Sequence, residues 1–208
     1  MIKLDTVIIT GASREIGKIT AELFASKGYN VLLNYNSSEA AAAELTAELK
    51  TKGYSVAMFK ADVSKKDEVD SMVDFCVEVF GGIDVLVNNA GIAKSNLFIK
   101  ISGEEWDEII NVNLKGVFNC SQAVLRYMLP EKKGKIINIT SIWGMVGAAC
   151  EVHYSVAKAG VIGLTKALAK KLGPSNIQVI CIAPGIIKTE MRLGYSKGYL
   201  FKLLFANE

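Results

Sequence analysis

The sequence lacks three features that would place it in other classes of protein. It has no dense block of lysine and arginine, and its net charge of +3 is small for 208 residues, so nucleic-acid binding is not expected. No apolar run reaches the ~18 residues that suggest a membrane span. The chain opens directly on a strand-like pattern, MIKLDTVIIT, without a secretory leader. These absences predict a soluble, cytoplasmic protein.

Cysteine is also scarce, and no two cysteines form a CxxC pair. The four cysteines are far apart and lie in apolar stretches: Cys76, Cys120, Cys150 and Cys181. Such cysteines are typical of reduced, buried thiols in a cytosolic protein. No metal site is expected. The chain also lacks internal repeats and low-complexity linkers, so its length favours one well-buried α/β domain.

Short apolar runs alternate with longer segments of helical period along most of the chain. Strands are expected at 6–10, 30–34, 56–60, 85–88, 135–140 and 178–183, and helices at 16–27, 39–52, 65–80, 104–129 (intact or broken) and 154–172. The continuous Val- and Ile-rich runs are typical of strands covered on both faces. Alternating strands and helices predict parallel strands joined by right-handed crossovers. We therefore expect a Rossmann-type, doubly wound α/β fold with strand order 3-2-1-4-5-6 and a ligand crevice at the carboxyl ends of its strands.

Three residues predict where helices begin or end. Ser64 precedes an acidic segment and is expected to cap the third helix. Gly28 and Gly53 follow two other helices, and each is expected to end its helix in a left-handed conformation.

A glycine-bearing turn follows the first expected strand, with the sequence Thr10-Gly-Ala-Ser-Arg-Glu-Ile-Gly17. Such a turn lets backbone N–H groups and the dipole of the next helix face a pyrophosphate. Any tight strand-to-helix turn favours glycine, so the motif is weak by itself. The stretch after the second strand, 34–37, lacks the acid that binds the ribose 2′-hydroxyl in NAD sites. Arg14 suits a 2′-phosphate, which favours NADP(H); the alternative is a solvated loop arginine.

Polar and small residues follow the next two strands, at the expected rim of the crevice. Asp62 follows the third strand and could accept a hydrogen from an adenine amino group. Ala90 and Gly91 follow the fourth strand and let a cofactor approach the backbone. Ordinary turn chemistry explains the same residues.

Tyr154 and Lys158 lie four residues apart at the start of an expected helix and therefore share one face. A phenol, with a pKa near ~10, is a poor acid–base catalyst at neutral pH unless a nearby cation stabilises its anion. The spacing alone is common, and an amphipathic helix with a surface lysine explains it too. Ser141 follows the fifth strand at the same rim, and Asn113 lies on the long preceding helix.

Two neighbours of this group have other expected roles. His153, the only histidine, should point away from the face that carries Tyr154, so we do not expect it to transfer protons. Trp143 and Met145 are expected to line a substrate pocket, although packing explains them nearly as well.

Together these motifs resemble a short-chain dehydrogenase/reductase of the 3-oxoacyl-[acyl-carrier-protein] reductase type, over roughly residues 3–192. The resemblance implies that Tyr154 protonates a ketone oxygen, with Lys158 stabilising the phenolate and holding the nicotinamide ribose. It implies that Ser141 binds the carbonyl and that Asn113 holds a relay water. It also implies an NADP(H) site formed by Gly11, Ser13, Arg14, Ile16, Gly17, Asn36, Ser37, Asp62, Val63, Asn89, Ala90, Gly91, Tyr154, Lys158, Pro184, Gly185 and Thr189.

The chain departs from the family pattern at three places. Glu15 stands where the family's glycine turn has its middle glycine, and its carboxylate would repel a phosphate unless the side chain points to solvent, Arg14 or Lys18. Ile180 stands where relatives commonly carry Asn. The end of the chain is short, so the domain is expected at 1–192 with an atypical tail at 193–208 and no seventh strand.

The leading functional expectation is NADPH-dependent reduction of a 3-oxoacyl thioester in fatty acid synthesis. An acyl carrier protein is the implied partner and could meet Lys132, Lys133 and Lys135, which a solvated turn explains equally well. The alternatives are a reductase of another ketone (acyl-CoA, sugar, polyol or steroid) and a weak or inactive paralogue that acts through binding or assembly. A homo-oligomer is expected, a dimer more readily than a tetramer.

Overall fold

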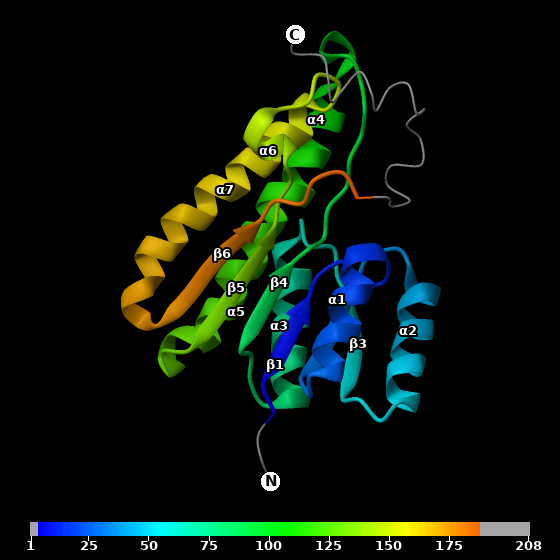
Figure 1. The fold of residues 1–208 in the computed structure, drawn as a ribbon, viewed down its shortest axis with the longest axis vertical. Coiled ribbons are helices and arrows are strands. Elements are labelled where there is room, and N and C mark those ends of the chain that lie inside the picture. Colours follow the sequence, from blue (N-terminus) through cyan, green and yellow to red (C-terminus); the bar gives the residue numbers. More distant parts are fainter. Residues whose placement is uncertain (1–3, 188–208) are drawn as a thin grey trace.

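The computed structural model describes residues 4–187 of the chain and contains one parallel six-stranded sheet (Figure 1). The strands run in the order β3-β2-β1-β4-β5-β6, which confirms the predicted doubly wound topology. Their bounds are β1 Thr6–Ile9, β2 Asn30–Tyr35, β3 Val56–Lys60, β4 Val85–Asn88, β5 Gly134–Ile139 and β6 Ile177–Ile182. All neighbouring strands pair in parallel, so their carboxyl ends meet at one edge.

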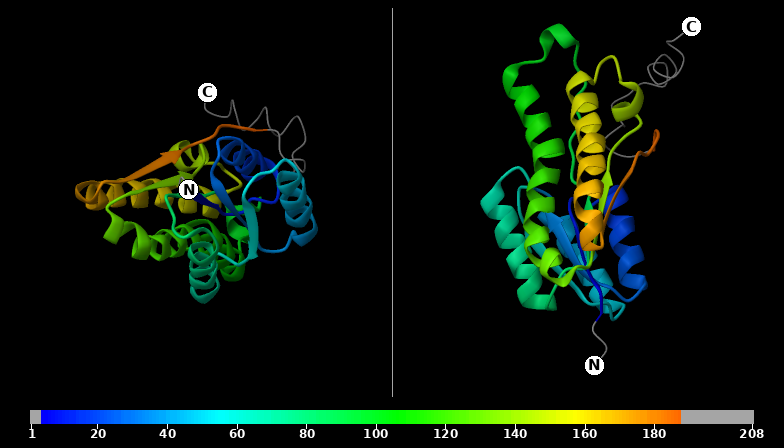
Figure 2. Two further views of the ribbon diagram at one scale, coloured as in Figure 1. Left: turned by 90° about the horizontal axis from the view of Figure 1, so that it is seen from below. Right: turned by 90° about the vertical axis from the view of Figure 1, so that its left-hand side faces the viewer.

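Helices cover the two faces of the sheet unequally (Figure 2). One face packs against α3 (Lys66–Phe80), α5 (Gly116–Glu131) and α7 (Val152–Leu172), and its core extends from β2 to β6. The other face packs against α1 (Glu15–Ser26) and α2 (Glu39–Thr51). Shorter elements complete the described chain: η1 Phe98–Lys100, α4 Gly103–Ile110, η2 Asn111–Lys115, α6 Trp143–Val146 and η3 Gly173–Ser175.

The helix predicted at 104–129 is broken in the middle. It comprises α4, then one wider turn of π-helix at η2, then α5. Such π-turns inside α-helices are frequently found at functional sites, and Asn113 lies within this one.

One predicted helix boundary is wrong and two are confirmed. The residue before α3 is Lys65, and no side chain caps that helix. The Ser64 hydroxyl instead donates a hydrogen bond to Asp62 Oδ1 at 2.7 Å. The side chain that was expected to cap the helix is therefore bonded within the turn before it. Gly28 and Gly53 have φ values of +83° and +82°, as predicted for the left-handed residue that follows a helix.

Within residues 4–187, the outer strand β6 is covered on one face only. Ile177 and Val179 are buried, whereas Ile180 and Ile182 are 53% and 49% exposed. The expected tail at 193–208 and the question of a seventh strand lie outside the described residues.

Two further findings bear on the predicted class. Among residues 4–187, no helix is long and apolar enough to span a membrane. The cysteines are free thiols, with Cys76 and Cys120 buried, and burial raises the pKa of each of these two thiols to about 12.

Candidate active site

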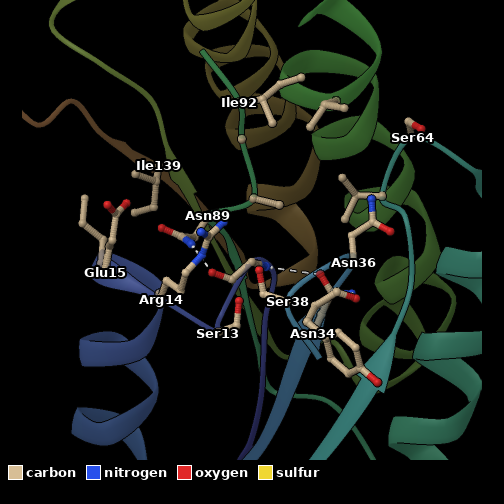
Figure 3. Close-up of a pocket in the computed structure, with 18 of the residues that line it drawn as sticks. Ser13, Arg14, Glu15, Asn34, Asn36, Ser38, Ser64, Asn89, Ile92 and Ile139 are labelled. Atoms are coloured by element: carbon tan, nitrogen blue, oxygen red, sulfur yellow. Dashed lines mark hydrogen bonds between the residues drawn. The ribbon is translucent and has the colours of Figure 1, made fainter. Parts of the chain in front are cut away.

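A cavity of about 560 Å³ lies at the carboxyl ends of the strands (Figure 3). Its volume falls in the range of small-molecule sites. It brings together nearly all the residues that the sequence predicted for this site: Gly11, Ser13, Arg14, Ile16, Gly17, Asn36, Ser37, Asp62, Val63, Asn89, Ala90, Gly91, Ser141, Tyr154, Lys158, Pro184 and Gly185. Asn113 does not line it, and Thr189 lies outside the described residues.

The glycine turn after β1 leaves no room for a side chain at its two glycines, Gly11 and Gly17. Gly11 has φ +62°, and a Cβ there would lie 2.9 Å from Ala90 Cα. A Cβ on Gly17 would lie 2.2 Å from the Gly11 carbonyl oxygen. Asn89 Nδ2 donates to that same oxygen at 3.0 Å, and Asn34 Oδ1 accepts from Gly11 N–H at 3.2 Å. The turn is thus held against the ends of β2 and β4, with the start of α1 facing the cavity.

Arg14 and Glu15 stand at the start of α1. Arg14 is extended, whereas Glu15 has a positive φ of +51°. Both line the cavity. In Figure 3 the Glu15 side chain lies at one side of the pocket, away from Asn36 and Ser64, whereas the Arg14 side chain extends toward Asn89.

The opposite end of the cavity is formed by the segments after β2 and β3. Asp62 Oδ1 accepts bonds from the N–H and the hydroxyl of Ser64 at 2.9 and 2.7 Å. Asn36 and Ser37 are exposed at the cavity edge. Asn34, which the sequence did not single out, donates to Ala61 O at 2.9 Å and so ties the two segments together.

Lys158 is held beneath the cavity by main-chain atoms. Its Nζ donates to the Ile139 carbonyl at 3.0 Å and lies 5.5 Å from the centre of the Tyr154 ring. Only 3% of the residue is exposed, and burial lowers the pKa of its ammonium group to about 8. Thr140 Oγ1 donates to the Lys158 carbonyl at 2.9 Å, which fixes this turn of α7 against the end of β5.

Ser141 and Trp143 follow β5 and serve different environments. Ser141 lines the cavity, and its Oγ accepts from Trp143 N–H at 3.2 Å. Trp143 is 5% exposed and packs with Tyr154 and Ala157 rather than lining the cavity. Met145 is 66% exposed. The packing interpretation therefore holds for Trp143, and neither residue lines this cavity.

Asn113 is fully buried beside the cavity. Its Nδ2 donates to the carbonyls of Ile92 and Ile109, both at 2.9 Å, and its Oδ1 accepts from Ile92 N–H at 3.2 Å. A Cβ on Gly91 would lie 2.7 Å from Asn113 Oδ1 and 3.5 Å from Lys158 Nζ. Asn113 therefore holds the segment after β4 close to the lysine.

His153 points away from the cavity, as predicted. Its fully buried ring places Nε2 3.0 Å from Glu105 Oε1 on α4. The sequence did not reveal Glu105 as its partner, because 48 residues separate the two and the pairing has no local pattern.

Comparison with known proteins shows the family of the chain. The family model described as short chain dehydrogenase matches residues 5–199. The chain is 47% identical over 186 residues to the 3-oxoacyl-[acyl-carrier-protein] reductase FabG of Staphylococcus epidermidis, a match that covers 89% of this chain and 76% of the relative. It is 46% identical over 187 residues to the 3-oxoacyl-[acyl-carrier-protein] reductase of Synechocystis sp., with 90% and 76% covered. The chain therefore belongs to the short-chain dehydrogenase family of oxidoreductases.

Proposed function

We propose that the protein reduces 3-oxoacyl thioesters with NADPH. One observation carries the proposal: Tyr154, Lys158 and Ser141 line the same cavity as the glycine turn at the start of α1. A proton donor and a nucleotide-binding turn thus face one space. The names of the similar reductases indicate the acyl-carrier-protein-linked 3-oxoacyl group as substrate.

The residues that line the cavity fit a dinucleotide. The start of α1 offers backbone N–H groups and a positive helix end to a diphosphate. Gly11 is packed against Ala90 and bonded to Asn34, and without a side chain it lets a ligand approach the backbone. Asp62 and Val63 would hold the adenine end, while Tyr154, Lys158 and Pro184 would hold the nicotinamide end. When bound, the nicotinamide cofactor supplies the hydride.

Tyr154 is the proposed proton donor to the carbonyl oxygen. The Lys158 ammonium, 5.5 Å from the tyrosine ring centre, stabilises the phenolate left after proton transfer. The Ser141 hydroxyl lines the same cavity and donates a hydrogen bond to the carbonyl, which places the oxygen for the proton.

Asn113 has a positioning role in this proposal. Both polar atoms of its buried amide bond to main-chain groups of Ile92 and Ile109, and Oδ1 keeps a second lone pair for the proposed relay water. The side chain also keeps Gly91 close to Lys158.

The preference for NADPH over NADH stays a proposal that Arg14, Asn36 and Ser37 support. All three line the cavity, and the segment after β2 that carries Asn36 and Ser37 brings no carboxylate to it. A guanidinium and small polar groups suit a 2′-phosphate, whereas a carboxylate there would suit the bare ribose.

The lysines at 132, 133 and 135 do not serve a carrier protein at the mouth of the cavity. They precede or begin β5, at the amino edge of the sheet, opposite the cavity. Lys133 Nζ binds Asp5 and Asp84 at 2.9 and 2.7 Å. These lysines are therefore better interpreted as part of a solvated turn, in which Lys133 links the segments before β1 and before β4.

The proposal predicts that Tyr154→Phe removes reduction and keeps cofactor binding. Because general acid catalysis contributes 10²–10⁴-fold, turnover of a 3-oxoacyl thioester should fall by about 10²-fold or more. NADPH affinity, followed by its fluorescence, should change less than about threefold. Tyr127→Phe, far from the cavity and bonded to Asp74 at 2.8 Å, is the matched control. Near-normal turnover of Tyr154→Phe would refute the assignment.

A second candidate is a weak or inactive paralogue, which the cavity-lining Glu15 favours. The same titration separates the two candidates, since a paralogue of this kind would not bind NADPH at millimolar concentration.

We also propose a dimer through α5 and α7, on which Phe118 and Val156 are 46% and 44% exposed. Light scattering after size exclusion measures the mass of the assembly and so distinguishes a dimer from a monomer or a tetramer.

A further inference from the structure

Glu15 has a positive φ of +51°, which is unusual for a residue that begins a helix. Three non-glycine residues among 4–187 have positive φ: Glu15, Lys132 and Asn176. Lys132 and Asn176 end α5 and η3, where a left-handed residue is common. Glu15 begins a helix instead. A residue held in a sparsely populated conformation persists because its surroundings impose it, and such residues gather at functional sites.

The turn around Glu15 imposes this conformation. Gly11 N–H bonds to Asn34, and Asn89 Nδ2 bonds to the Gly11 carbonyl. Gly17, two residues after Glu15, packs against that carbonyl with no room for a Cβ. Both sides of Glu15 are therefore fixed, and the direction of its side chain follows from the turn rather than from the preference of the residue.

That direction places a carboxylate at an anion-binding position. Glu15 is the first residue of α1 and lines the cavity, where the N–H groups and the dipole of the helix attract negative charge. In Figure 3 its side chain lies at the side of the pocket that is away from Asn36 and Ser64. A diphosphate at the start of α1 would meet this carboxylate, whereas a group on the adenosine ribose, near Asn36, would not.

We propose that Glu15 sets the affinity of the protein for its dinucleotide, by repelling the diphosphate that all nicotinamide dinucleotides share. The inference rests on the proposed function, because it assumes that the cavity takes such a cofactor. Glu15 is not a catalytic residue here. It weakens the binding of NADPH and of NADH by the same factor. The ratio of the two affinities is set by the residues at the adenosine end.

Two substitutions separate the charge of Glu15 from its backbone strain. Glu15→Gln keeps the size and the positive φ and removes the charge, while Glu15→Gly removes both the charge and the strain. We expect Glu15→Gln to lower the dissociation constants of NADPH and NADH alike by about tenfold, which corresponds to about 1.4 kcal/mol. Glu15→Gly should bind at least as tightly and also melt at a higher temperature. The KM for NADPH should fall in both variants, with kcat unchanged within about twofold.

Salt dependence gives a readout that a purely structural role would not change. Because added salt screens the repulsion, the advantage of Glu15→Gln over the native protein should shrink between about 50 and 500 mM NaCl. Glu22→Gln is the control: Glu22 lies on the same helix, 3.9 Å from Lys18, does not line the cavity, and should leave both dissociation constants unchanged.

Each outcome of these titrations is decisive. Equal binding by the native protein and Glu15→Gln overturns the inference and leaves the proposed function standing. A gain for NADPH more than about threefold larger than for NADH also overturns it, since the carboxylate would then act on the 2′-phosphate. Absence of binding in every variant refutes the proposed function itself.

Discussion

At the scale of single residues, Lys158 combines a charge with deep burial. It is 3% exposed, and its Nζ hydrogen-bonds to one main-chain carbonyl. Burial lowers the pKa of its ammonium group from 10.5 to about 8. Between these two values the unfolded chain binds a proton that the folded chain does not, so folding stability rises as the pH rises from about 8 to about 10.5. Below pH 8 the full cost of burying the charge is present.

We therefore expect Lys158→Met to be more stable than the native protein at pH 7, by about 1–3 kcal/mol, because Met fills similar space without charge. The difference should shrink between pH 8 and pH 10. Urea unfolding at both ends of this range measures it, and turnover should be lost. Lys166→Met, an exposed lysine on the same helix, should show no such pH-dependent gain. A less stable Lys158→Met at pH 7 would contradict the assigned cost.

The residues of the site differ in how far the sequence could predict them. Some residues could be predicted because they lie near the ends of strands and have side chains suited to a known role, as Gly11, Asp62 and Tyr154 do. The Ile139 carbonyl that holds Lys158 could not be predicted, because every residue has a carbonyl. Ser64 was assigned to the wrong partner, since its hydroxyl meets Asp62 within its own turn and the sequence does not rank such competing local bonds.

At the scale of elements, the start of α7 depends on α4. Glu105 Oε1 meets the fully buried His153 Nε2 at 3.0 Å, and Glu105 Oε2 accepts from Asn96 Nδ2 at 3.3 Å. Asn96 N–H in turn donates to the Cys150 carbonyl at 2.9 Å. One carboxylate thus joins α4, the loop before it and the segment that leads into Tyr154.

Removal of this carboxylate should loosen that junction. Glu105→Ala leaves the His153 ring nitrogen buried without its partner, which costs about 1–3 kcal/mol. We expect thermal unfolding to show this loss, while Glu105→Gln, which keeps an acceptor, should recover most of it. Asp107→Ala changes an exposed acid on the same helix and serves as control. Equal stability of Glu105→Ala and the control would show that the pair contributes nothing.

The elements themselves were largely predictable, because strands covered on both faces and amphipathic helices have different periods. The order of strands followed from parallel crossovers and is confirmed. The π-helix at Asn111–Lys115 was predicted only as a break, since the change from one hydrogen-bonding pattern to another depends on tertiary contacts such as those of Asn113 with Ile92.

At the scale of the whole molecule, the two faces of the sheet are covered to different extents. Among the described residues, the core on the α3, α5 and α7 side includes β6, whereas the core on the α1 and α2 side reaches only to β5. Ile180 and Ile182 consequently expose about half of their surface on an edge strand. Exposed apolar edge strands promote association between chains.

We expect Ile180→Asn to reduce concentration-dependent association and to change the free energy of unfolding by less than about 1 kcal/mol, as is usual for a surface position. Light scattering at rising protein concentration measures association, and urea unfolding measures stability. Ile180→Val keeps an apolar side chain and should associate like the native protein. If Ile180→Asn and Ile180→Val scatter alike, the exposed isoleucine does not drive association.

The carbonyl that anchors Lys158 has a consequence for how this cavity can evolve. Any amino acid at position 139 offers the same carbonyl to Nζ, while the side chain of Ile139 lines the cavity. Substitutions there can reshape the space offered to a ligand without moving the ammonium group. The geometry of the lysine is thus inherited through the main chain, and selection remains free to vary the ligand through the side chain.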